Sequence, residues 1–426
     1  MFQLGNQVRS IGVRAFLIAW GWILLLPTGW SQLRQEKISF QLTRIAKLPL
    51  ESVEILTLSS NSINGKSPQF VVGDKVLHFY SNDGRLRKSQ HFPYSIYAIA
   101  ADSFVGAYYL EPEIDGQKLN WYVFHSTGDK AYYLQWAIGR DQLIPRLFLS
   151  NQGTTVIFFP EECLIKFFDS DGHEIHSTVC FEDASFTYER NVAGVFSDDG
   201  RWFCLATMEN AAVPDTPDEV GRSGSPTLIL FDQNGQEQWR VAIDGYWSSH
   251  VAVSNHGDYL AVCSYRFDET NGVTLPTTVL FNQEGQEIFS LDFLFRRACF
   301  SPEENFLLLA DQNQVLLVEL KNRELIWRKS FDSIEGLLIN TAVAHNAEAI
   351  ALLFANGKYV QGKFLYENPQ LLWLTRNGTE LDLQQLSGEK FQNSVLEFSA
   401  EGSKVFVGTG SEYFELTKSI DNDSSR

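Results

Sequence analysis

The chain contains 426 residues, of which 44% are hydrophobic and 20% are charged, a composition typical of a globular protein rather than a disordered one. Acidic residues outnumber basic residues by 52 to 34, so the formal net charge is −18. This acidity argues against binding to nucleic acids or to anionic membrane surfaces, because both need clustered Lys and Arg side chains.

The first 31 residues have the layout of a secretory signal peptide. Two arginines precede an uncharged apolar run over residues 15–26, and the small residues Gly29 and Ser31 follow at positions suited to cleavage. A membrane-spanning helix needs about 20 apolar residues, so a cleaved signal is favoured over an uncleaved anchor. We therefore expect residues 1–31 to be removed, leaving no stable membrane span, and the mature protein to be secreted or periplasmic.

A strand-turn-strand unit then recurs along the chain. Residues 228–241 read LILFDQNGQEQWRV, and residues 279–291 read VLFNQEGQEIFSL. Asn-Gly and Asp-Gly between alternating apolar stretches predict tight hairpins with two-residue turns, in which both turn residues have positive φ. With a mean spacing of 49 residues, the turns fall at Gly84, Gly128, Gly172, Gly235, Gly285, Arg323 and Gly378.

A second unit precedes each hairpin and consists of a strand, a turn of the Ser-x-x-Gly type and another strand. Examples are VFSDDGRWFCLAT from residue 195 and ACFSPEENFLLLAD from residue 298. The second strand of this unit is apolar on both faces, which is typical of a strand buried between two neighbouring sheets. The two units together make four strands, at about the period of one β-propeller blade.

The repeat resembles the WD-repeat and pyrroloquinoline-quinone-type β-propellers. The blade phrase Ser-Pro-Asp-Gly corresponds to 197–200 and 301–303, and the phrase aromatic-Asp … Gly … Trp corresponds to Phe231-Asp232 … Gly235 … Trp239. The resemblance covers Glu51 to about Thr417 and implies an all-β propeller fold. The Gly-His and Trp-Asp pairs of true WD repeats and the Thr-Gly-Lys-x-x-Trp phrase of quinone enzymes are missing, so no cofactor is expected.

The blade count follows from the repeats. Seven full hairpins are visible, and an eighth unit at 394–417 lacks its outer strand, which residues 38–45 could supply. Eight blades are therefore favoured over seven, with the ring closed by the N- and C-terminal strands in one blade. We expect a single propeller domain over 32–420 and a disordered tail over 421–426. Stacked sheets or two smaller domains are the alternatives, and the lack of a long linker disfavours two domains.

The five cysteines allow one structural prediction. A two-residue turn at Asp171-Gly172 pairs Cys163 with Cys180 at a non-hydrogen-bonded position, where the Cα atoms lie about 4.5 Å apart. That distance suits a disulfide, and we predict a Cys163–Cys180 bridge. The sequence contains no Cys-x-x-Cys pair and no recognised catalytic motif, so neither a metal site nor catalytic residues are predicted.

Loop lengths indicate which face of the propeller is functional. In a four-stranded blade, the loops between strands two and three emerge on the same face as the connections between blades. Long loops of this kind are predicted at 111–119, 209–226, 266–276 and 356–370, and long loops on a rigid scaffold are typical of functional surfaces. The aromatic and basic binding candidates on this face are Tyr188, Arg190, Arg222, Tyr246, Trp247, Arg266 and Arg296.

One position is of special interest because it repeats where the first strand of a blade enters the central channel. Arg146, His250, Arg297 and Thr341 occupy it in four blades. Two functions are consistent with such a mouth. A non-enzymatic propeller would bind a protein, peptide or glycan there. A quinone-dependent or hydrolytic enzyme would instead need these groups beside a carboxylate such as Glu189 or Glu397. The lack of catalytic motifs favours binding.

Overall fold

The computed structural model describes most of the chain after residue 37. The described residues are 38–47, 54–57, 70–81, 85–101, 103–180, 191–208, 227–243, 250–268, 270–360, 363–387, 390–399, 401–410 and 412–420. Residues 38–420 form one compact unit. The predicted signal peptide and C-terminal tail lie outside the described residues. In the described part of the chain, no helix is long and apolar enough to cross a bilayer.

The described strands form eight antiparallel sheets of four strands each, which we number as blades in chain order. Blade 1 comprises β2 (Glu54–Thr57), β3 (Phe70–Val72), β4 (Val76–Tyr80) and β5 (Leu86–His91). Blade 2 comprises β6 (Tyr97–Ala100), β7 (Phe104–Glu113), β8 (Gly116–His125) and β9 (Lys130–Gly139). Blade 3 comprises β10 (Arg146–Leu149), β11 (Thr155–Phe159), β12 (Leu164–Phe168) and β13 (Glu174–Val179). Blade 4 comprises β14 (Asn191–Phe196), β15 (Trp202–Met208), β16 (Thr227–Asp232) and β17 (Glu237–Ala242).

The remaining four blades repeat this order. Blade 5 comprises β18 (Val251–Val253), β19 (Tyr259–Asp268), β20 (Val273–Asn282) and β21 (Glu287–Leu291). Blade 6 comprises β22 (Arg297–Phe300), β23 (Phe306–Asp311), β24 (Gln314–Glu319) and β25 (Glu324–Ser330). Blade 7 comprises β26 (Leu337–Val343), the 3₁₀ turn η2 (His345–Ala347), β27 (Ile350–Val360), β28 (Lys363–Leu374) and β29 (Glu380–Gln385). Blade 8 comprises β30 (Ser394–Phe398), β31 (Lys404–Thr409), β32 (Glu412–Ile420) and β1 (Ile38–Lys47).

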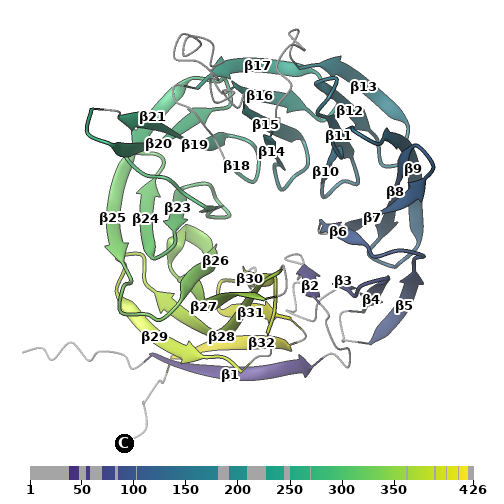
Figure 1. The fold of residues 1–426 in the computed structure, drawn as a ribbon. Helices are drawn as coiled ribbons and strands as arrows, with labels where there is room; N and C mark the ends of the chain where they lie inside the picture. The colour runs from purple at the N-terminus through teal and green to yellow at the C-terminus, as the bar shows by residue number, and fades with distance from the viewer. Residues whose placement is uncertain are drawn as a thin grey trace, which may run out of the picture. The chain divides into compact units, whose positions relative to one another are not determined.

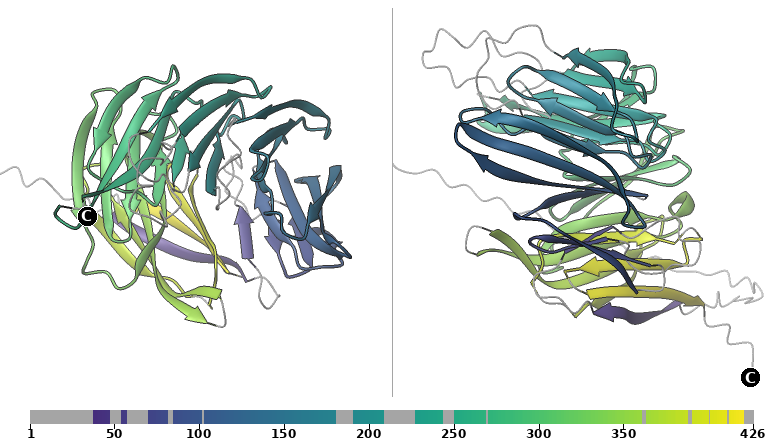
Figure 2. Two further views of the ribbon diagram at one scale, coloured as in Figure 1. Left: turned by 45° about the horizontal axis from the view of Figure 1, so that its top comes forward. Right: turned by 90° about the vertical axis from the view of Figure 1, so that its right-hand side faces the viewer.

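The blades are arranged in chain order around a common centre, with the first strand of each blade innermost (Figure 1; Figure 2 gives two further views). Each innermost strand contacts the innermost strand of the next blade, and β30 of blade 8 contacts β2 of blade 1. The structure therefore confirms the predicted all-β fold with eight four-stranded blades.

The N-terminal strand completes the last blade. β1 pairs antiparallel with β32 from Ile38↔Ile420 to Lys47↔Glu412. It supplies the outer strand that the eighth unit lacks, as the sequence predicts. Since β32 is thereby paired on both sides, the two ends of the described chain are held in a single sheet.

The hydrophobic core is divided among the spaces between blades. The second strands are buried where they pack between blades, as in β23, where five of the six residues are buried, and in the first six residues of β27. One cluster joins Phe158 of blade 3 to Phe203 and Phe231 of blade 4, and six more clusters of the described residues join other neighbouring blades. Burial on both faces explains the continuous apolar runs in the sequence.

The hairpins between third and fourth strands differ in one respect from the prediction. In blade 4, Gly235 N–H donates to Asp232 O at 2.9 Å and Asp232 N–H donates to Gln236 O at 3.0 Å. This is a type I turn followed by a glycine bulge, in which only the glycine has positive φ. The expected two-residue turn is therefore wrong. The Asp232 carboxylate favours the longer turn because it accepts the N–H groups of Asn234 and Gln236.

The predicted Cys163–Cys180 disulfide is also wrong, because both thiols are free. The register does place the two residues opposite each other, but Cys180 N–H donates to Cys163 O at 2.8 Å, so the position is hydrogen-bonded. Cys163 has φ of 50° and its Sγ lies 4.0 Å from the carbonyl oxygen of Pro160. Cys180 instead packs in the core between blades 3 and 4, where burial raises the pKa of its thiol to about 12.

Three of the four predicted long loops are extended hairpins. The ladders continue outward to Glu113↔Gly116 in blade 2, Asp268↔Val273 in blade 5 and Val360↔Lys363 in blade 7. Ladder pairing satisfies backbone groups that a loop would leave to water. The fourth, 209–226, lies outside the described residues. We call the face that carries these hairpin ends the hairpin face, and the opposite one the turn face.

Candidate functional site

A cavity of about 430 Å³ opens at blade 6. The connection between β23 and β24 is short, with Asp311 paired to Gln314 and Gln312 at φ of 47°. In the neighbouring blades 5 and 7, the corresponding hairpins are long. A short turn between two long hairpins gives the hairpin face a recess, which we call the blade 6 pocket. Its volume is in the range of ordinary ligand sites.

The pocket is lined by apolar residues, which we call its apolar wall, and by polar and basic residues, all contributed by blades 5, 6 and 7 and their connections. The apolar lining residues are Leu294, Ala310, Leu337, Leu338 and Ile339. The polar lining residues are His250, Arg296, Arg297, Gln312 and Tyr366. Such a combination of apolar surface and a few polar groups is typical of sites that bind amphipathic ligands.

Arg297 is held by backbone carbonyls rather than by an acid. Its Nε donates to Ile339 O at 3.0 Å, and its Nη1 donates to Arg296 O at 3.2 Å. Among the described residues, no carboxylate lies within ion-pair distance of this exposed guanidinium. A guanidinium has five N–H donors, so Arg297 has donors to offer an anion while its position is fixed by blade 7.

Arg296 has a partner, unlike Arg297. Its Nε lies 2.8 Å from Asp311 Oδ1. Burial raises the pKa of Asp311, although the guanidinium opposes this shift. The pair balances one positive charge, which leaves Arg297 as the uncompensated cation of the pocket.

His250 contributes an uncharged imidazole at neutral pH. Burial lowers its pKa from the ordinary value of 6.5, and the positive charges of Arg297 and Arg296 lower it further. Its ring lies 6.2 Å from the ring of Phe295, measured between centroids. The pocket can therefore bind and orient an anion, and it gains positive charge when the solution becomes acidic.

The structure brings together three of the residues predicted from the sequence, His250, Arg296 and Arg297. Arg146 begins β10 in blade 3 and is exposed, outside the pocket lining. Arg266 lies on β19 opposite Leu275, and its side chain is outside the described residues. Also outside them are Tyr188, Arg190, Arg222, Tyr246 and Trp247.

The repeated channel position is occupied slightly differently from the prediction. In blades 3, 5 and 6, the backbone N–H of a serine closes the turn after the first strand. The channel position lies four residues before that serine, at Arg146, His250 and Arg297. In blade 7 this rule selects Asn340 rather than Thr341, because the N–H of Ala344 closes the turn. In blade 2 it selects Tyr97, which is 62% exposed and stacks on Tyr108 at a ring distance of 5.2 Å. Sequence reasoning missed Tyr97 because Ala101 replaces the usual serine.

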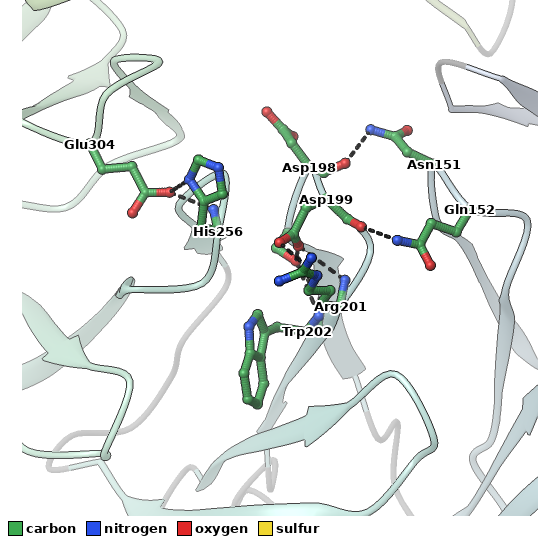
Figure 3. Close-up of polar contacts among 9 residues, drawn as sticks. Asn151, Gln152, Asp198, Asp199, Arg201, Trp202, His256 and Glu304 are labelled. Atoms are coloured by element: carbon green, nitrogen blue, oxygen red, sulfur yellow. Dashed lines mark hydrogen bonds and ion pairs between the residues drawn. The ribbon is translucent and has the colours of Figure 1, made fainter.

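The turn face carries a different polar cluster, shown in Figure 3. Asn151 Nδ2 donates to Asp198 O at 2.8 Å, which links blade 3 to blade 4. His256 N–H donates to the Glu304 carboxylate, and its Nδ1 lies 3.1 Å from the same oxygen, which links blade 5 to blade 6. Because these groups bond to one another across blade junctions, their role is structural.

A group of potential metal ligands lies at the blade 3 hairpin. Asp169, Asp171 and His173 bring their ligand atoms within 4.8 Å of one another. Asp169 Oδ1 accepts the N–H groups of Asp171 and His173 at 3.0 and 2.8 Å. These bonds are those of an Asp-stabilised turn, which accounts for the cluster without a metal.

Comparisons with known proteins identify neither a family nor a curated relative: no family model matches the chain, and no curated protein matches it. Among solved structures, the chain is similar to a crystal structure of a eukaryotic initiation factor, with a TM-score of 0.46 and 10% identity over 74% of this chain and 72% of that chain. It is also similar to Kuenenia stuttgartiensis hydrazine synthase, with a TM-score of 0.41 and 13% identity over 63% of this chain and 74% of that chain. The function of the blade 6 pocket therefore has to be inferred from its own residues.

Proposed function

We propose that this protein is a non-enzymatic binding propeller of the WD-repeat and pyrroloquinoline-quinone type, whose ligand docks on the hairpin face. The ligand is part of a protein, peptide or glycan, and it places an anionic group in the blade 6 pocket. The signal-like segment at residues 1–31 supports a secreted or periplasmic location.

The observation that carries the proposal is the uncompensated guanidinium of Arg297 beside an apolar wall. The protein has a net charge of −18, so a basic recess contrasts with an acidic molecule. A cation held by carbonyl groups in a recess concentrates positive potential there. The lining offers one imidazole, that of His250, whereas hydrolysis or redox catalysis would need further reactive groups.

Calorimetry with small carboxylates tests this function. N-acetyl-leucine, hexanoate and phenylacetate serve as probes, and bound probe should also raise the melting temperature. Arg297→Gln should weaken binding about tenfold or more, because a charge-assisted hydrogen bond is lost. Arg201→Gln is the matched control, since Arg201 is exposed on the turn face beside Asp199. If no probe binds, or if both variants bind as the unmodified protein does, the pocket is not the ligand site.

A further inference from the structure

We infer that the blade 6 pocket recognises the C-terminal residue of a polypeptide, with its α-carboxylate on Arg297 and its apolar side chain against the leucine-rich wall. This inference rests on the proposed function and specifies the class of ligand.

The charge of the pocket matches a single negative charge. Asp311 compensates Arg296 through the 2.8 Å contact, and His250 is uncharged at neutral pH. One guanidinium therefore remains, and its fork of N–H groups fits the two oxygens of a carboxylate. A phosphate group carries nearly two charges and would need additional cations.

The apolar wall distinguishes a chain end from an acidic side chain. Leu337 is 41% exposed at the pocket and half-buried Leu294 also lines it, whereas Ile339 lines it but is largely buried in the core between blades 7 and 8. A C-terminal residue carries a carboxylate and an apolar side chain on the same carbon atom, so both halves of the pocket can be filled at once. In Asp or Glu the carboxylate is the end of the side chain itself, so the same residue has no apolar side chain left to contact the apolar wall.

The rim of the pocket favours a peptide over a free organic acid. Gln312 is exposed at the turn, and its amide can both donate to and accept from a peptide backbone. A small organic acid would contact the apolar wall but would make no hydrogen bond to the Gln312 amide. In a bound peptide, the residues before the C-terminal one would extend out of the pocket past the side-chain amide of Gln312. Capture of a terminal carboxylate is a recurring mode of peptide recognition.

The pocket is organised before a ligand arrives. Arg296 N–H donates to Ala310 O at 2.8 Å, and Leu338 N–H donates to Gln312 O at 2.7 Å. The second of these bonds joins blade 6 to blade 7, as does the bond from Arg297 to Ile339. Since the guanidinium and the wall are held by backbone contacts, binding costs little side-chain ordering.

The experiment is an affinity selection on the immobilised full-length protein. A synthetic octapeptide library with randomised sequence and free C-termini is compared with the same library carrying C-terminal amides. We expect enrichment only from the free-carboxylate library, with Leu, Ile, Val or Phe at the last position. For a selected peptide, amidation and Arg297→Gln should each weaken binding at least tenfold, while Arg201→Gln should leave it unchanged. Leu337→Asp should abolish the apolar preference at the last position.

The outcomes separate this inference from the proposed function. If small carboxylates bind through Arg297 but the two libraries behave alike, the pocket binds anions and does not read a chain end. Equal affinities of N-acetyl-leucine and the selected octapeptide would identify a small-acid site and overturn the inference. So would tighter binding of amidated peptides that contain Asp or Glu. If no probe of any class depends on Arg297, both proposals fail.

Discussion

Single residues join neighbouring blades at the outer edge of the propeller. Trp239 on β17 packs against Gly285 of the next blade and donates its Nε1–H to Gln283 O at 2.6 Å. Trp327 on β25 repeats this contact by donating to Arg376 O at 2.6 Å. Gly285 is needed for two reasons, because its φ is 76° and a Cβ there would lie 2.8 Å from the indole.

Substituting this glycine should therefore be costly. Gly285→Ala is expected to lower the free energy of unfolding by about 2–4 kcal/mol, of which about 1–2 kcal/mol comes from the left-handed backbone. Urea unfolding followed by tryptophan fluorescence measures the change. Gly272→Ala is the control, because Gly272 has φ of 65° but no atom within 4 Å of its Cβ position. Equal losses in the two variants would show that the indole contact contributes nothing.

His250 gives the pocket a pH dependence. Its pKa lies below 6.5 because of burial and the adjacent Arg297 and Arg296. Lowering the pH from 7.5 to 5.5 increases the imidazolium fraction, while a ligand carboxylate with a pKa near 3.5 stays ionised. The affinity for N-acetyl-leucine should therefore rise as the pH falls, because a bound anion favours the charged imidazole.

Calorimetry across this pH range with His250→Gln tests the assignment. In the variant, the affinity for N-acetyl-leucine should no longer rise as the pH falls. Any remaining rise would come from Asp311, because burial raises the pKa of its carboxyl group. An unmodified protein whose affinity is flat with pH, or a variant with the same slope, would rule out His250 as the titrating group.

At the level of elements, hairpin length decides where the hairpin face is recessed. Blades 5 and 7 extend their second and third strands by several pairs, while blade 6 turns directly after Asp311. The blade 7 hairpin also supplies Tyr366, whose backbone pairs with Phe391 beside blade 8. The position of the pocket thus depends on elements whose lengths vary from blade to blade.

Shortening one hairpin at a time should show which hairpin the pocket depends on. Replacing residues 357–366 of blade 7 with Asn-Gly joins the paired residues Asn356 and Glu367 through a two-residue turn. Calorimetry should show at least tenfold weaker binding of N-acetyl-leucine, because the change removes Tyr366 from the lining of the pocket. The matched change in blade 2, replacing 111–118 between Leu110 and Leu119, should leave binding intact. Loss of binding in both would indicate a general disturbance of the fold.

At the level of the whole molecule, stability depends on the pairing of the chain ends. Each described core cluster is shared by two blades, so no blade buries its apolar faces alone. β1 joins blade 8 through nine residue pairs with β32. Removing it would leave the edge of β32 unpaired and weaken the link between the two ends.

Truncation tests this closure. Deleting residues 1–37 should leave the free energy of unfolding unchanged, because β1 is retained. Deleting residues 1–47 should lower it by at least about 3 kcal/mol, since several net hydrogen bonds of about 0.5–1.5 kcal/mol each are lost. Thermal and urea unfolding of both forms measure the difference. Similar stabilities would show that β1 is dispensable for closure.

Much of the architecture follows from sequence because its signals are local. The turn glycines and the buried second strands each depend on residues within a few positions of one another, and the missing outer strand of the last unit follows from counting strands per unit. The same locality explains the partial success at the site. His250, Arg296 and Arg297 lie at blade junctions, and junctions recur at a readable period, so all three could be nominated before the fold was known.

Other features were decided only by tertiary structure. Gln312 lies in the turn after β23, Leu337 begins β26 and Tyr366 lies on β28, and nothing in their local sequence indicates that they share a pocket. The predicted register places Cys163 opposite Cys180 correctly, but the positive φ of Cys163 and the packing of Cys180 between blades 3 and 4 do not follow from that register. Local chemistry thus determined the blades and their order. Packing between blades, which joins residues far apart in the chain, determined the pocket, its uncompensated charge and the thiols that stay free.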